Sequence, residues 1–185
     1  MKTGIYLLTA LAMVSVAVAD EDIASKMINK ESNGSWYVQP DKPKAQHIKA
    51  EVPGGFAFRV KANKGVNPWD VQASSPVAGA INEGDVIMLN YFARAEEAAE
   101  GGSSLTARIQ LAAAPYSSVL ETTAKISGEW KSYCAFRVVT ASIPEKKSNV
   151  SIHLATAKQI IDLGPVFVFN FGPGYDKSKL AFCDG

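Results

Sequence analysis

Apolar and polar residues alternate with a period of two along most of the chain. The clearest case is the segment 105–111, LTARIQL, in which four apolar residues alternate with Thr106, Arg108 and Gln110. Successive side chains of a β-strand point to opposite faces of its sheet, so this pattern is typical of a strand with one buried and one wet face. No segment keeps the 3.6-residue apolar period of an amphipathic helix, and only residues 96–100 favour a helical turn. The pattern therefore predicts an all-β protein.

Turn residues divide this pattern into a series of short segments. Clusters of Gly, Pro, Asn and Asp separate them, and Gly164-Pro165 is expected to break the last one. Many short strands at regular spacing favour a β-sandwich jelly roll over an alternating α/β fold. The expected strands are residues 45–52, 56–62, 69–74, 86–95, 105–111, 118–126, 129–140, 150–155 and 159–171.

Residues 1–19 have the character of a cleavable export signal. Lys2 precedes an apolar run over residues 5–18, and the small residues Ala17 and Ala19 occupy the −3 and −1 positions of a cleavage site. The run is shorter than the roughly 20 apolar residues that a membrane anchor needs. We therefore predict a signal peptide cleaved after Ala19, a secreted or periplasmic protein, and no membrane span once the signal is removed.

Composition indicates one globular domain. The 185 residues carry 19 Lys and Arg against 18 Asp and Glu, a net charge of +1, which gives no basic excess for a nucleic-acid partner. Residues 20–35 are expected to form a flexible or weakly helical lead-in. Residues 36–185 are expected to form the β-sandwich, which we expect to be a monomer.

The mature chain contains two cysteines, Cys134 and Cys183. In an oxidising compartment two such residues often pair, and a bridge would pin the C-terminal tail to the sandwich. Two unpaired thiols remain the alternative, because the sequence does not give the distance between the two Cα atoms.

Motifs of catalysis are absent from the sequence. It has no HExxH, CxxC, Gly-rich phosphate loop or GxSxG elbow, and its two histidines are far apart. A glycosidase needs two carboxylates facing each other across a cleft. The candidates stand mostly at turns and strand ends, where carboxylates are commonly solvated: Glu51, Asp70, Asp85, Glu129 and Asp162.

Planar polar and aromatic side chains gather on the polar faces of several expected strands. In the segment 86–95, Asn90, Phe92 and Arg94 share one face. Sugars stack their apolar faces on aromatic rings, and amide and guanidinium groups bind their hydroxyls. If these strands share a sheet with those of residues 69–74 and 105–111, their outward faces would form one shallow groove. An ordinary sandwich exterior is the open alternative.

Three segments together resemble the carbohydrate-binding modules of families 4, 9, 16 and 22. They are NPWDVQASSPVAGAINEGDVIMLNYFARA (67–95), GEWKSYCAFRV (128–138) and SIHLATAKQIIDLGPVFVFNFG (151–172). Trp69, Gln72 and Arg94 match residues of the pattern. The resemblance covers most of residues 36–172. It implies a galactose-binding-like jelly roll that binds a β-glycan in a groove across one sheet, with no required cofactor but often a structural calcium ion. The metal ligands stay unknown.

The prediction is a secreted, non-catalytic protein that binds a plant or microbial β-glycan. The alternatives are a small glycan-active hydrolase or accessory part of a glycoside hydrolase system, and a structural or adhesion sandwich without a sugar site. The expected binding residues, of which the last two are the weaker candidates, are Trp69, Asp70, Gln72, Asn90, Phe92, Arg94, Arg108, Gln110, Tyr133 and Gln159.

Overall fold

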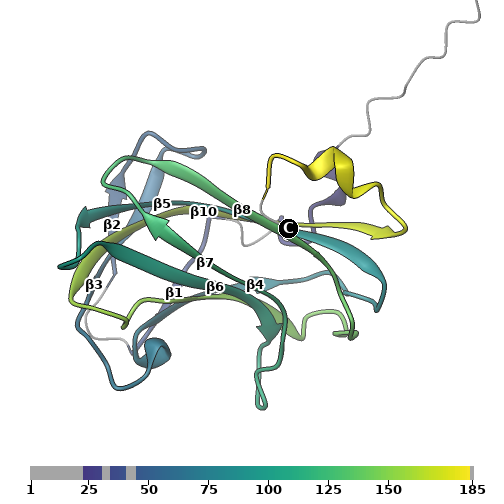
Figure 1. The fold of residues 1–185 in the computed structure, drawn as a ribbon, viewed down its shortest axis with the longest axis horizontal. Coiled ribbons are helices and arrows are strands. Elements are labelled where there is room, and N and C mark those ends of the chain that lie inside the picture. Colours follow the sequence, from purple (N-terminus) through teal and green to yellow (C-terminus); the bar gives the residue numbers. More distant parts are fainter. Residues whose placement is uncertain (1–22, 31–33, 41–44, 184–185) are drawn as a thin grey trace, which may run out of the picture.

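The computed structural model describes residues 23–30, 34–40 and 45–183, and they form two stacked antiparallel sheets (Figure 1). The predicted signal peptide lies outside the described residues. Sheet A has the strand order β2 (Gln46–Lys49), β3 (Phe56–Ala62), β10 (Gln159–Pro173), β5 (Asp85–Glu97) and β8 (Lys131–Val138). Sheet B has the order β1 (Tyr37–Gln39), β4 (Gln72–Val77), β9 (Ser148–His153), β6 (Ser103–Leu111) and β7 (Ser118–Ile126). The predicted all-β sandwich is confirmed.

Alternation along the strands builds the core between the two sheets. In β6 the side chains of Leu105, Ala107 and Ile109 are fully buried, whereas Thr106 and Arg108 lie on the outer face. Strands β5 and β9 contribute inward residues in the same way. The apolar half of each predicted strand thus faces the partner sheet, which leaves the polar half of sheet B on its outer surface.

Two boundaries differ from the sequence prediction. Strand β10 passes through Gly164-Pro165 with a shift of register instead of ending there. A Cβ atom at Gly164 would lie 2.9 Å from the Cβ of Phe92, so glycine lets the two strands approach at this bulge. Strand β5 also continues to Glu97, so no helical turn forms at residues 96–100.

Part of the expected lead-in belongs to the fold. After the 3-10 turn η1 (Ile23–Lys26), Ile28 donates its backbone N–H to Val168 O at 2.8 Å. The buried amide of Asn29 donates to Val166 O and accepts from Val168 N. These bonds fix the segment against β10, which differs from the predicted flexible lead-in.

The C-terminal tail covers one end of the outer face of sheet A. The 3-10 turn η3 (Lys177–Leu180) follows β10, and Met27, which comes directly after η1, packs against the same apolar cluster as Leu180 (Figure 1). Leu180 is buried there in a second apolar cluster that includes Phe169 and Phe171. A disulfide joins Cys134 of β8 to Cys183, with the two Cα atoms 5.0 Å apart. Within the described part of the chain, the only helices are 3-10 turns of three or four residues, and none could cross a membrane.

Candidate functional site

The outer face of sheet B carries a hollow of about 470 Å³, here called the Trp69 hollow. Its floor is formed by polar side chains of three adjacent strands, β4, β9 and β6, and its rim by two loops. Four of the residues predicted for binding meet here. The residues that line it are Trp69, Gln72, Arg108, Gln110, Pro115, Tyr116 and His153.

A short loop presents the ring of Trp69. The 3-10 turn η2 (Pro68–Asp70) is held by the Asp70 carboxylate, which accepts the backbone N–H groups of Val66 at 2.8 Å and Asn67 at 3.0 Å. These bonds lower the pKa of Asp70, the Asn67 backbone bond most of all. Asp70 therefore shapes the loop instead of lining the hollow. Trp69 stays 53% exposed, and its ring meets His153 edge-on with the centroids 5.9 Å apart.

The polar floor is ordered by bonds between strands. Ser151 of β9 donates its hydroxyl to Gln72 Oε1 at 2.9 Å, and Gln72 Nε2 donates to Gln39 Oε1 at 3.2 Å. Arg108 Nε lies 2.8 Å from Glu121 Oε2 on β7, close enough for an ion pair, although the Nε–H does not point at a hydrogen-bond acceptor. The floor is thus preorganised and nearly neutral in charge.

His153 is the most deeply placed ionisable group of the hollow, with 5% of its surface exposed. Burial lowers its pKa below the ordinary value of 6.5, and the positive charge of Arg108 lowers it further, while Glu121 acts in the opposite direction. At neutral pH the imidazole is therefore uncharged, so it has one donor and one acceptor nitrogen for a ligand hydroxyl.

Three residues of the hollow were missed by the sequence prediction: Pro115, Tyr116 and His153. His153 follows the alternation of residues 150–155, so extending that pattern to the polar face would have found it. Tyr116 stands in the turn between β6 and β7, is 52% exposed and has a backbone φ of 57°. No local pattern marks Tyr116, because only the hairpin brings it beside the floor of the neighbouring strands.

The expected single groove needs correction, because β5 lies in the other sheet. Strand β5 pairs with β10 and β8, so Asn90, Phe92 and Arg94 face outward from sheet A, on the opposite side of the molecule. Asn90 bonds Ser132, with Nδ2 2.8 Å from Oγ. The predicted residues therefore form two groups on opposite faces.

The guanidinium of Arg94 is already engaged. Its Nε donates to Asp162 Oδ2 at 2.8 Å, its Nη2 lies 2.7 Å from Glu96 Oε2, and the group sits 5.3 Å from the ring centroid of Trp130. Arg59 holds the other side of Asp162, and this ion pair raises the pKa of Arg59 above its ordinary value. Arg94 is therefore a link between β5 and β10.

Tyr133 and Gln159 do not line the Trp69 hollow either. Tyr133 stacks on the core residue Tyr91 with the centroids 5.5 Å apart. Gln159 is buried and donates to Leu154 O at 2.8 Å. Both face the interior of the sandwich, because their register partners on the neighbouring strands face inward too.

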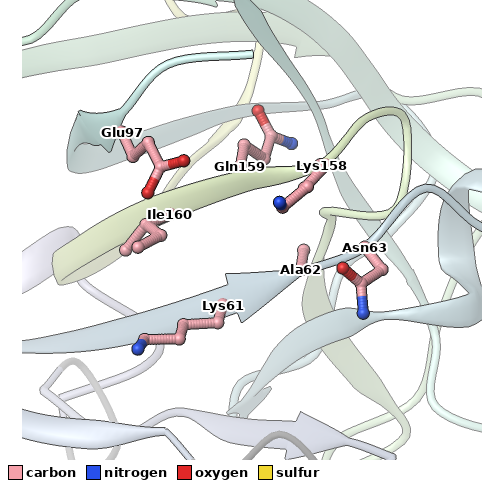
Figure 2. Close-up of a pocket in the computed structure, with 7 residues that line it drawn as sticks. All are labelled: Lys61, Ala62, Asn63, Glu97, Lys158, Gln159 and Ile160. Atoms are coloured by element: carbon pink, nitrogen blue, oxygen red, sulfur yellow. The ribbon is translucent and has the colours of Figure 1, made fainter.

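A second depression, of about 620 Å³, lies at one end of sheet A (Figure 2). None of its seven lining residues is aromatic. Figure 2 shows two ammonium groups, those of Lys61 and Lys158, together with the carboxylate of Glu97. This surface offers charged and amide groups but no ring for stacking, so the Trp69 hollow is the better candidate.

Calcium binding by side chains finds no support in the described residues. Among residues 23–30, 34–40 and 45–183, no group of three or more His, Cys, Asp or Glu side chains is placed to hold a metal ion. Asp85 already accepts from the amide of Asn170 at 2.7 Å. A calcium ion in this part of the chain would therefore need backbone, amide or water oxygens in addition to at most two carboxylates.

Comparisons with known proteins identify the fold. No protein-family model matches the sequence, and no curated protein matches it. Among solved structures, a CBM4 module aligns with a TM-score of 0.55 and 14% identity over 80% of this chain and 96% of that one. The N-terminal cellulose-binding domain of Cellulomonas fimi β-1,4-glucanase C aligns at 0.54 with 18% identity, over 75% and 91% of the two chains. The chain has the β-sandwich fold of carbohydrate-binding modules.

A third similar structure is the CBM22-1 xylan-binding domain of Paenibacillus barcinonensis Xyn10C. It has a TM-score of 0.50 and 8% identity, over 78% of this chain and 91% of that one. At such identities the similarity establishes the shared fold, and the ligand has to be argued from the residues of this chain.

Proposed function

We propose that the protein is a secreted, non-catalytic carbohydrate-binding protein that holds a plant or microbial β-glycan on the outer face of sheet B. The observation that carries the proposal is the Trp69 hollow, where two half-exposed aromatic rings border an ordered polar floor. Export is supported by the signal sequence of residues 1–19 and by the disulfide, which persists in oxidising compartments.

The chemistry of the hollow suits a sugar ring. The faces of Trp69 and Tyr116 offer apolar area for the C–H side of a pyranose, and the polar floor offers groups that bind hydroxyls in pairs. Because the floor is held by bonds between strands, little side-chain freedom is lost on binding. Affinity would come from several such contacts acting together.

The hollow does not favour the hydrolase alternative. Glycoside hydrolysis generally uses two carboxylates on either side of the scissile bond. None of the seven residues that line the hollow is acidic. Asp70 is bound within its own loop, and Glu121 is paired with Arg108. This composition supports binding without catalysis.

The decisive experiment compares Trp69→Ala with Phe92→Ala in a pull-down of the mature protein on insoluble xylan, cellulose and β-glucan. Both changes remove an aromatic ring, but the rings lie on opposite sheets, so Phe92→Ala is the matched control. We expect wild type and Phe92→Ala to bind one polymer, and Trp69→Ala to bind it roughly tenfold more weakly or worse. Loss of polymer binding in both variants, or in neither, would place the binding site elsewhere. No binding by the wild type would favour the structural or adhesion alternative.

A further inference from the structure

A second hollow lies on the same face of sheet B, beside the first. It has a volume of about 490 Å³ and is here called the Tyr37 hollow. Its aromatic member is Tyr37 on β1, which is exposed, and its floor again comes from β4 and β9. The residues that line it are Tyr37, Ser74, Pro76, Val77, Ala78, Ala112, Lys146, Ser148 and Asn149.

The two hollows meet at a cross-strand pair. Gln110 of β6 lines the Trp69 hollow, Asn149 of β9 lines the Tyr37 hollow, and the two residues are register partners. Their side chains therefore stand next to each other on the outer face. One route from the Trp69 hollow to the Tyr37 hollow crosses this pair.

The pair has unused hydrogen-bonding capacity. Gln110 is only 4% exposed, yet its Oε1 has no hydrogen-bond partner among the described residues, and neither has Asn149 Oδ1. A buried polar atom left unpaired is costly, so such a cluster points to a group that a ligand or ordered water satisfies.

No formal charge belongs to this cluster. The nearest charges are those of Arg108, which lies against Glu121, and of Lys146, which lines the Tyr37 hollow at its exposed rim 3.6 Å from Glu145. Amide and hydroxyl groups pair well with sugar hydroxyls, which both donate and accept. The unpaired atoms of Gln110 and Asn149 are carbonyl oxygens, which need a hydrogen-bond donor. A free sugar hydroxyl supplies that donor, whereas a carboxylate or an ester-blocked oxygen does not.

We infer that Gln110 and Asn149 form a specificity subsite that accepts a sugar residue with free hydroxyls and rejects one that is O-acetylated or carboxylated there. The inference rests on the proposed function, since it assigns selectivity to the same face. It names the ligand as a neutral, unsubstituted stretch of glycan that spans both hollows. Selectivity arises because a blocked hydroxyl would leave buried amide oxygens unpaired in the complex.

The test measures binding of xylan and β-glucan hexasaccharides by calorimetry, each unsubstituted and partially O-acetylated. The variants are Gln110→Leu and Asn149→Leu, and Asn90→Leu on the opposite sheet is the matched control. Wild type and control should prefer the unsubstituted sugar roughly tenfold or more. The two groove variants should bind the unsubstituted sugar roughly tenfold more weakly and lose the preference.

The outcomes separate this inference from the proposed function. One outcome would overturn the subsite and keep the binding face: Gln110→Leu and Asn149→Leu retain the affinity and the preference of the wild type, while Trp69→Ala loses affinity for the glycan. Absence of binding in the wild type would overturn both. The smaller substitutions Gln110→Ala and Asn149→Ala serve as a second pair of variants that avoids the bulk of leucine. Thermal unfolding identifies any variant that fails to fold.

Discussion

His153 couples the Trp69 hollow to pH. Its pKa in the folded protein lies below 6.5, chiefly because of burial, so the unfolded chain takes up the proton first as the pH falls. The free energy of unfolding therefore falls as the pH drops below about 6.5, and it stops falling once the folded imidazole is protonated as well. Above pH 6.5 both states are neutral at this residue, and the penalty is absent.

Replacing His153 by Gln should therefore flatten the acid side of the stability profile. We expect the urea midpoint of wild type to fall more between pH 7.5 and 5.0 than that of His153→Gln, since carboxylates titrate equally in both proteins and cancel in the comparison. Urea unfolding followed by fluorescence at the two pH values measures this difference. Equal falls in both proteins would show that the imidazole titrates alike in the folded and unfolded chain.

At the scale of elements, the sequence did not show which strands pair with one another. Alternation in residues 105–111 predicted which side chains of β6 face the core, and the structure agrees. The same alternation in β5 correctly put Asn90, Phe92 and Arg94 on one outward face. Periodicity describes the two faces of one strand, however, and both sheets of a sandwich have an outer face. Pairing of β5 with β10 and β8 depends on contacts distant in sequence. The separation of the expected groove residues onto two sheets was therefore not foreseeable.

Arg94 links two strands on the outer face of sheet A. It lies beside Asp162, whose side chain is fully buried, and it shares Glu96 with Arg59. Arg94→Ala would leave the buried carboxylate with Arg59 alone, and we expect a loss of roughly 1–3 kcal/mol in the free energy of unfolding. Glycan affinity should stay at the wild-type value, because the residue is on the opposite sheet from the Trp69 hollow.

Chemical unfolding and a glycan pull-down on the same preparations check both halves of this prediction. Arg108→Ala is the informative counterpart, because its ion pair with Glu121 is more exposed and lies at the hollow. It should lose affinity with little change in stability. A loss of affinity in Arg94→Ala at full stability would contradict the assignment of faces.

Across the whole molecule, the two outer faces are used differently. Sheet B leaves its polar strands open to solvent between two loops, whereas sheet A is covered at one end by the C-terminal tail. Tyr175 stacks on Phe171 with the centroids 4.4 Å apart, and Leu180 fills the cluster beneath. The tail therefore extends the apolar interior beyond the two-sheet core.

The disulfide should stabilise this arrangement without taking part in binding. It closes a loop with a sequence separation of 49 residues, so replacing Cys134 and Cys183 together by Ser should cost about 2–4 kcal/mol of unfolding free energy. The wild type treated with a dithiol reductant should show a similar loss, while the double variant should not respond to the reductant. Glycan affinity of the folded double variant should match the wild type, because the tail and the Trp69 hollow lie on opposite sheets. If the double variant binds the glycan more weakly than the wild type at temperatures where both proteins are folded, the tail contributes to the binding face. The assignment of binding to sheet B alone would then be wrong.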